Sequence, residues 1–140
     1  MMLLVASTNV KAQTNAQRDW TNVIDAIAMI ESGGNPKAHN KNGDCAGLLQ
    51  ITPVLVMEIN NQLKARKINK KYSKADRYNP QKSKEMFVWF QKFFNKSGDV
   101  EKAVRMWNGG IGYKIKSTNG YYKKFLKYYH PKTVIRRGKK

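Results

Sequence analysis

Apolar side chains recur at intervals of three and four residues in five separate stretches of this chain. Such spacing places them along one face of an α-helix, whereas a half-buried β-strand would alternate apolar and polar residues. The five stripes run from Trp20 to Ile30, Leu55 to Leu63, Met86 to Phe94, Val100 to Trp107 and Tyr121 to Tyr129. We find no convincing strand, no internal repeat and no domain linker. The pattern therefore predicts an all-α protein with a single helical domain.

Residues that typically begin helices stand before these stripes. A side-chain oxygen can accept hydrogen bonds from first-turn amides, and proline suits the first position because it has no amide hydrogen to leave unpaired. The expected starts are Asp19, Thr52 followed by Pro53, the Asn79-Pro80 turn, Asp99, and about Thr118. Glycines follow the first, third and fourth stripes where the helices should end, and His130-Pro131 follows the fifth. A basic stretch follows the second.

The composition is that of a folded domain with a strongly basic character. Hydrophobic residues make up 41% of the 140 positions, and 27 lysines and arginines against 9 acids give a formal net charge of +18. This charge favours an anionic partner such as nucleic acid, anionic lipid or an acidic cell-wall polymer, without choosing among them. Cys45 is the only cysteine, and His39 and His130 are the only histidines. Because metal centres usually need more such ligands, we expect no metal and no cofactor.

The first residues resemble a secretory signal. Met1 to Val5 are apolar, and Val10-Lys11-Ala12 has the small-x-small pattern of a cleavage site. Because the apolar run is short and lacks a basic start, residues 1–12 are interpreted as a truncated signal peptide, with a frayed terminus as the alternative. Residues 13–130 would then form the domain and 131–140 a basic tail, in a secreted or periplasmic protein of the cell envelope. No stretch approaches the roughly 18 apolar residues of a membrane span.

One of the nine acids, Glu31, continues an apolar stripe. It shares a face of the first helix with Trp20 and Ile27, so its carboxylate should be partly desolvated near the C-terminal end of that helix. Desolvation and the negative end of the helix dipole both raise the pKa of a glutamate, as a general acid requires. The alternative is a helix-end glutamate that turns to solvent or pairs with a lysine. Most of the other acids are interpreted as helix caps or solvated side chains. Glu58 is expected on the exposed face of its helix.

Four short motifs follow one another along the chain. They are Glu31-Ser32, the segment Gly47-Leu48-Leu49-Gln50-Ile51-Thr52-Pro53, the segment from Ala103 to Gly110, and Thr118 with Tyr121 and Phe125. In this order they resemble the soluble lytic transglycosylase family, which is related to goose-type lysozyme. The resemblance spans roughly Trp20 to Tyr129 and implies a lysozyme-like helical domain with a substrate cleft. The loop before Gly47 departs from the family pattern by about one additional residue.

The resemblance implies cleavage of peptidoglycan at the β-1,4 bond between N-acetylmuramic acid and N-acetylglucosamine. Glu31 would serve as the single acid and base. It would protonate the linking oxygen and then accept the proton of the muramoyl C6 hydroxyl, which closes a 1,6-anhydro ring without consuming water. Most glycosidases use two carboxylates for the equivalent steps.

Five further site residues follow from the resemblance, and three of them have a structural alternative. Gln50 would bond to substrate or order the catalytic loop, or else satisfy backbone groups. Asn108 would contact the N-acetyl group or cap its helix, and Gly109 would let the backbone approach a sugar. Tyr121 would reach the catalytic glutamate and hold it protonated, or belong to the core. Ser32 would support the site.

Two other readings stay open at this stage. If Asp44 lies across the cleft from Glu31, it could activate water, and the protein would be a hydrolytic lysozyme. The second reading is a non-catalytic basic protein that binds cell wall or nucleic acid, although the chain has no zinc finger, RRM signature or basic zipper. We expect a monomer that binds peptidoglycan and not nucleic acid, with secretion or conjugation machinery as a further candidate partner. Trp107 is expected in the core.

Overall fold

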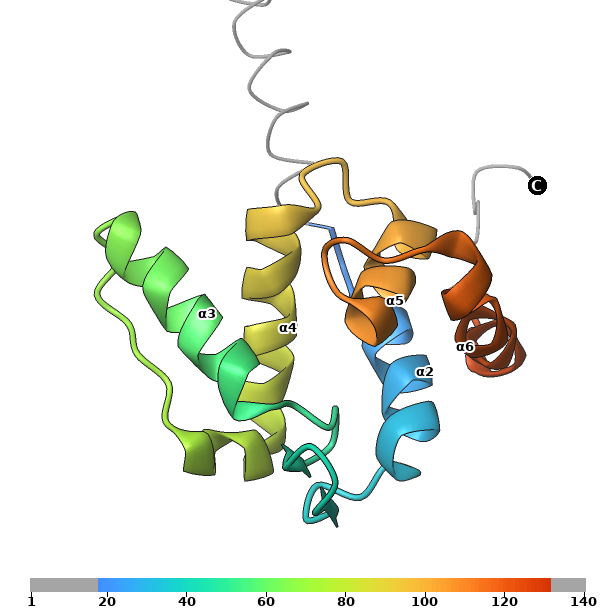
Figure 1. Ribbon diagram of the computed structural model, residues 1–140, viewed down its shortest axis with the longest axis horizontal. Helices are drawn as coiled ribbons and strands as arrows, with labels where there is room; N and C mark the ends of the chain where they lie inside the picture. The colour runs from blue at the N-terminus through green and yellow to red at the C-terminus, as the bar shows by residue number, and fades with distance from the viewer. Residues whose placement is uncertain (1–17, 132–140) are drawn as a thin grey trace, which may run out of the picture.

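The computed structural model describes residues 18–131, which form five α-helices and a very small sheet (Figure 1). The helices are α2 (Thr21–Ser32), α3 (Pro53–Ala65), α4 (Pro80–Phe94), α5 (Val100–Gly109) and α6 (Ile115–Tyr128), with a short 3-10 helix η1 (Lys74–Tyr78) before α4. Each helix coincides with one of the five predicted stripes, and the all-α class is confirmed. The predicted signal peptide, and the basic tail beyond Pro131, lie outside the described residues.

Helix α4 lies at the centre of the fold, with α3 on one side and α2, α5 and α6 on the other (Figure 1). Its buried Phe87 contacts Trp20 at the start of α2 and Trp107 on α5, with ring centroids 5.7 and 4.9 Å apart. Burying one phenylalanine side chain contributes about 1.5–3 kcal/mol. Helix α6 packs on both α2 and α5. The apolar stripes therefore meet in one core that is built around α4.

Three of the predicted helix starts, at Thr52, Asn79 and Asp99, are confirmed in detail. The Thr52 hydroxyl accepts a hydrogen bond from the Leu55 amide at 3.2 Å, and Pro53 occupies the first position of α3. The Asp99 carboxylate accepts one from the Lys102 amide at 2.7 Å at the start of α5. These contacts satisfy amides that have no partner within the helix, which fixes where each helix begins.

Helix α6 begins at Ile115, three residues before the expected start near Thr118. The first turn of α6 is held by Arg105 of α5, a residue that is only 5% exposed. Its Nη1 donates to the Ile115 carbonyl at 3.1 Å, and to the side-chain oxygens of Thr118 and Asn119 at 2.9 Å each. Because these bonds come from another helix, the spacing of apolar residues within α6 could not reveal them.

A two-stranded antiparallel sheet, β1 (His39–Asn40) and β2 (Cys45–Ala46), stands where no strand was expected. Two residues are too few to produce an alternating pattern, so this sheet leaves no signal in the sequence. The loop beyond it is fixed by Arg77 of η1, which is 3% exposed. Its Nη1 donates to the carbonyls of Asp44 and Ile51 at 2.6 and 3.0 Å.

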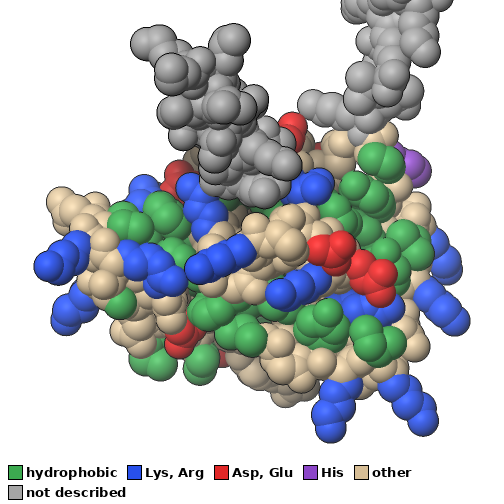
Figure 2. All heavy atoms as spheres, turned by 90° about the horizontal axis from the view of Figure 1, so that it is seen from above, with side chains coloured by type: hydrophobic (Ala, Val, Ile, Leu, Met, Phe, Trp, Pro, Cys, Tyr) green, Lys and Arg blue, Asp and Glu red, His purple; other side chains and the backbone are tan. Residues whose placement is uncertain are grey.

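Most other basic side chains lie on the surface. Lysine and arginine side chains spread across the face seen in Figure 2, with acidic side chains gathered in a few places among them. Among the helices of residues 18–131, none is long and apolar enough to cross a membrane. The basic surface is thus interspersed with acids and apolar patches, and charge alone does not identify a binding face.

Candidate active site

Glu31 lies in the last turn of α2 and lines a cleft of about 410 Å³. The walls come from the turn that follows β2, the first half of α3, one position of α4 and the C-terminal end of α5. The lining residues are Glu31, Gln50, Thr52, Val54, Leu55, Glu58, Phe90, Met106, Trp107, Gly110 and Ile111. Glu31 continues the buried apolar face of α2, so its carboxylate reaches this cleft from that face of the helix.

Burial raises the pKa of Glu31 above its usual range. A smaller opposing effect comes from Tyr121 of α6, whose hydroxyl donates a hydrogen bond to Glu31 Oε2 at 2.7 Å. In the described part of the chain no lysine or arginine pairs with this carboxylate. Glu31 is therefore a partly buried carboxyl group that retains its proton to a higher pH than an exposed glutamate, which suits a general acid.

The structure brings Tyr121 to Glu31, but the effect of the hydroxyl differs from the expectation. A hydroxyl that donates a hydrogen bond stabilises the carboxylate form, so Tyr121 lowers the pKa of Glu31 and does not hold it protonated. Burial of Tyr121, together with the neighbouring carboxylate, raises the pKa of its own hydroxyl. Tyr121 therefore stays a hydrogen-bond donor, and it fixes the orientation of the Glu31 side chain.

Replacement of this donor has an expected signature in the pH dependence. In Tyr121→Phe the hydrogen bond that lowers the pKa of Glu31 is lost, so that pKa should rise and the alkaline limb of activity should move to higher pH. The measurement is kcat/KM against pH on soluble glycan strands. Tyr122→Phe is the matched control, because Tyr122 packs its ring under Arg105. An unmoved alkaline limb in Tyr121→Phe would show that this hydroxyl does not act on Glu31.

Two neighbouring backbone carbonyl groups in the turn after β2 accept hydrogen bonds from side chains of α2 and α5. Ser32 Oγ donates to the Leu48 carbonyl at 2.7 Å, which ties the end of α2 to this turn. Trp107 Nε1 donates to the Leu49 carbonyl at 3.2 Å, which ties α5 to it. Ser32 thus has a structural contact with this turn, and its part in binding substrate stays a prediction.

Gln50 lines the cleft from a strained position in the same turn. Its φ of 53° lies in the left-handed region that few non-glycine residues adopt. Its side-chain nitrogen donates to the carbonyls of Gly47 and Ala38 at 3.0 and 3.3 Å, which holds the turn closed. Its side-chain oxygen accepts no hydrogen bond from residues 18–131, so it is available to a ligand. Gln50 thus satisfies backbone groups, which is one of its two expected roles, and contact with substrate stays a prediction.

The structure places Asn108 and Gly109 outside the cleft lining. Asn108 is exposed in the last turn of α5, where Gly110, not Asn108, is the residue that caps the helix. A Cβ atom on Gly109 would lie 2.8 Å from Thr118 Cγ2, so this glycine permits α5 to pack closely on α6. Gly110 and Ile111 instead contribute the end of α5 to the cleft.

A family model described as the transglycosylase SLT domain matches residues 8–130 of this chain. The chain belongs to this family. Searches of curated proteins and of solved structures found no significant match. SLT domains are generally lytic transglycosylases that act on peptidoglycan, which places the family's activity at the cell envelope. The cleft that Glu31 lines is thus the expected location of glycan-strand chemistry.

In this SLT domain, Asp44 is not among the residues that line the cleft. Its carboxylate is 2.8 Å from His39 Nε2, 3.4 Å from Arg77 Nη2 and 3.9 Å from Lys74 Nζ. The hydrogen bond with His39 and the nearby cations lower the pKa of Asp44. Asp44 therefore helps to hold the β1–β2 hairpin against η1. These contacts engage the carboxylate that would have to activate water in a hydrolytic lysozyme.

Sequence reasoning missed two residues of the cleft in this SLT domain. Trp107 was expected in the core, yet it is only half-buried and one part of it lines the cleft. Glu58 was placed on an exposed face, yet it lines the cleft together with Val54 and Leu55, and Gln62 donates to it at 2.8 Å. The spacing of 54, 55 and 58 along one helix face could have indicated Glu58, because the Gly-Leu-Leu-Gln motif directly precedes that face.

Proposed function

We propose that this SLT domain cleaves the β-1,4 bond between N-acetylmuramic acid and N-acetylglucosamine and leaves a 1,6-anhydro end. The observation that carries the proposal is the partly buried Glu31 in the cleft, with a raised pKa and a side chain oriented by Tyr121. A protonated carboxyl group at neutral pH is what the first step of glycoside cleavage requires.

The reaction can be balanced with this one carboxyl group. Protonated Glu31 gives its proton to the linking oxygen as the bond from that oxygen to muramoyl C1 breaks, which releases N-acetylglucosamine as an alcohol. The positive charge that develops at C1 is stabilised by the neighbouring N-acetyl group. The muramoyl C6 hydroxyl then forms a bond to C1, and the Glu31 carboxylate accepts its proton. Glu31 ends the cycle protonated, and water takes no part.

The surrounding groups fit a sugar ligand. Val54 and Ile111 at the cleft are 67% and 55% exposed, so they offer apolar contacts to the faces of sugar rings. The half-buried ring of Trp107 adds to this surface. The free side-chain oxygen of Gln50 can accept a hydrogen bond from a hydroxyl or an acetamido N–H. An apolar wall with a few oriented polar groups is typical of a binding cleft.

One observation favours a second candidate, which is hydrolysis. Glu58 is the other carboxylate of the cleft, and inverting or retaining glycosidases use a second carboxylate to activate water or to bind C1. Under our proposal Glu58→Gln still yields 1,6-anhydro ends, with a rate reduced by less than about tenfold. Mass spectrometry of the products decides this, with Gln62→Ala as a control for the lost hydrogen bond. Loss of all cleavage in a folded Glu58→Gln protein would assign Glu58 a catalytic role.

The experiment that tests the proposal is a digestion of purified peptidoglycan, followed by mass spectrometry of the muropeptides. We expect products that end in 1,6-anhydro-N-acetylmuramic acid. Products heavier by one water, with reducing ends, would establish hydrolysis instead. A folded protein that releases no muropeptides from any peptidoglycan would refute the proposed activity.

A further inference from the structure

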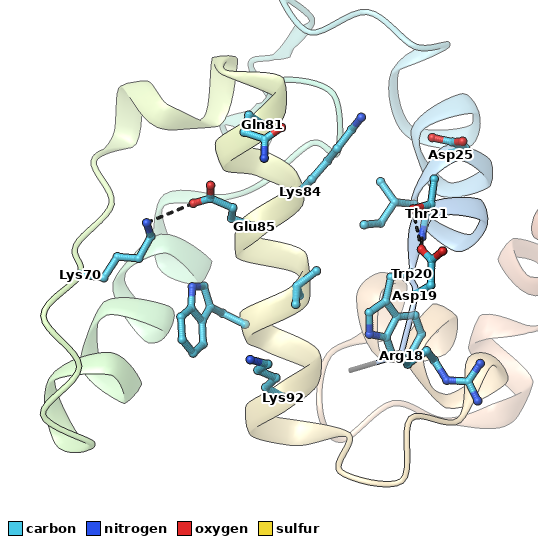
Figure 3. Close-up of a pocket in the computed structure, with 13 residues that line it drawn as sticks. Arg18, Asp19, Trp20, Thr21, Asp25, Lys70, Gln81, Lys84, Glu85 and Lys92 are labelled. Carbon is cyan, nitrogen blue, oxygen red and sulfur yellow. Dashed lines mark hydrogen bonds and ion pairs between the residues drawn. The ribbon is translucent and has the colours of Figure 1, made fainter. Parts of the chain in front are cut away.

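A second hollow, of about 560 Å³, lies on the side of α4 that faces away from the cleft (Figure 3). Helix α4 contributes Gln81, Lys84, Glu85 and Lys92 to it, and these positions recur at helical spacing. Phe90, which lines the catalytic cleft, points to the opposite side of the same helix. The start of α2 forms one wall of this second groove, and the segment that carries Lys70 forms the other.

Most charged side chains of this groove already have a partner. Lys70 Nζ is 3.4 Å from Glu85 Oε1, which also accepts a hydrogen bond from the Tyr72 hydroxyl at 2.7 Å. The Lys92 ammonium lies over the ring of Trp89, 5.0 Å from its centroid. These contacts hold the outer parts of the groove in place, and the charges of Lys70 and Glu85 compensate one another.

Lys84 and Asp25 differ from the other charged residues of this groove. Within residues 18–131, neither has an ion-pair, hydrogen-bond or ring partner, whereas Arg18 and Lys92 lie over tryptophan rings. The charged groups of Lys84 and Asp25 are more than 4 Å apart, because they form no salt bridge with one another. In Figure 3, Lys84 extends from α4 toward α2, and Asp25 projects from α2 beside the same space. One unpaired cation and one unpaired anion thus face the groove from its two walls.

The groove between these two charges has apolar walls. Trp20, Ile24 and Val88 line it, and Trp20 is only 6% exposed because Phe87 packs against its ring. A ligand that matches this surface has a carboxylate for Lys84, an ammonium group for Asp25, and a small apolar group for Trp20. Short zwitterionic peptides have these three features, whereas a neutral sugar or a nucleic acid offers no ammonium group to Asp25.

We propose that this groove binds the stem peptide of peptidoglycan, whose alanine methyl groups, carboxylates and free side-chain amine supply the three features. The choice of this peptide rests on the proposed function, since the stem peptide belongs to the same polymer that the cleft would cut. The groove would hold the wall through its peptides while the cleft acts on its sugars, on opposite sides of α4.

The test uses the three tryptophans of the chain, because two of them line the groove and the third lines the cleft. Titration of the ¹⁵N-labelled full chain with the free tetrapeptide L-Ala-D-Glu-diaminopimelate-D-Ala should shift the indole N–H signals of Trp20 and Trp89. The signal of Trp107 should stay in place. No shift at saturating peptide, or a shift confined to Trp107, would overturn the proposal.

Variants of the two unpaired charges make the test specific. Lys84→Gln and Asp25→Asn should each raise the Kd for the tetrapeptide by roughly five- to tenfold, which is typical of one charge-assisted contact. Lys123→Gln on the exposed face of α6 removes the same charge elsewhere and should leave Kd as it is. A tetrapeptide in which both amines, that of L-Ala and that of the diaminopimelate side chain, are acetylated should bind wild type and Asp25→Asn equally. Equal affinity of all variants for the free peptide would refute the assignment.

Two further outcomes separate this proposal from the proposed activity. Indole shifts at Trp20 and Trp89 in a protein that releases no muropeptides would support peptide binding in the groove and refute the proposed activity. Muropeptide release without these shifts would support the activity and refute peptide binding in the groove. A short oligonucleotide that shifts both signals at lower concentration than the peptide would overturn the groove assignment in favour of a nucleic-acid site.

Discussion

Glu31→Gln is expected to lower the rate of glycan cleavage by at least about a thousandfold, because the amide can neither give nor accept the proton in the two steps that we propose. The substitution keeps the size of the side chain and an oxygen that can accept the Tyr121 hydrogen bond. The measurement is the initial rate of muropeptide release from purified peptidoglycan. Activity within tenfold of wild type would remove Glu31 from the chemistry.

The same variant carries its own control for folding. Since burial raises the pKa of Glu31 in the folded protein, the folded state holds this proton more tightly than the unfolded state. Stability from this group is therefore fully present below the ordinary glutamate pKa and is lost as the pH rises through the raised pKa. Glu31→Gln removes this loss, so its Tm near neutral pH should equal or exceed that of wild type. A lower Tm together with lost activity would indicate a structural role.

The pH dependence of wild-type activity follows from the same group. In the mechanism that we propose, cleavage requires protonated Glu31, so kcat/KM should fall as the pH rises through the raised pKa of Glu31. The fall should lie at a higher pH than the ordinary titration range of an exposed glutamate. The measurement is the alkaline limb of the kcat/KM profile. A limb within the ordinary glutamate range would contradict the assigned effect of burial.

Gly47→Ala is expected to destabilise the fold by at least about 3 kcal/mol, and it should abolish the cleft along with stability. Gly47 has a φ of +84°, and an added Cβ would lie 1.7 Å from the carbonyl oxygen of Arg77. Because the opposing atom belongs to the backbone, η1 or the turn before Gln50 must move. The free energy of unfolding in urea measures the loss.

Gly33→Ala is the matched control for this prediction. Gly33 also has a left-handed φ, of +63°, but an added Cβ would have no atom within 4 Å. Only the backbone penalty of about 1–2 kcal/mol then applies. If both variants lose the same stability, the close approach of Gly47 to Arg77 contributes nothing to the fold.

The helices could be predicted from the sequence because each one buries a stripe on a single core. The spacing of Trp20, Ile27 and Glu31 was enough to place the Glu31 carboxylate at the buried side of α2. The contact between Glu31 and Tyr121 followed from the motifs alone, since nothing in the local pattern of α6 favours one of its tyrosines. The sequence could not indicate whether the Tyr121 hydroxyl raises or lowers the pKa of Glu31, because a hydroxyl can donate or accept a hydrogen bond. The positions of the atoms were needed to decide this.

The errors share one physical cause, which is contact between segments far apart in the chain. Nothing in the local sequence pattern indicates that Arg77 and Arg105 are buried, yet each lies in the interior and donates hydrogen bonds to another segment. Gly109 has the position of a substrate-binding glycine, but its neighbour is Thr118. Glu58 reads as exposed because the cleft it faces is formed by α5, fifty residues further along the chain. The spacing of apolar residues indicates which face of a helix is buried, but it does not indicate which other segment covers that face.

The hydrogen bond between Tyr121 and Glu31 joins residues 90 positions apart. During synthesis, the ribosome has released α2, α3, α4 and α5 before α6 can fold onto them. A nascent or truncated chain that ends before Tyr121 carries the glutamate without the donor that orients it. The contact that orients Glu31 is thus completed only when α6 folds onto the rest of the domain.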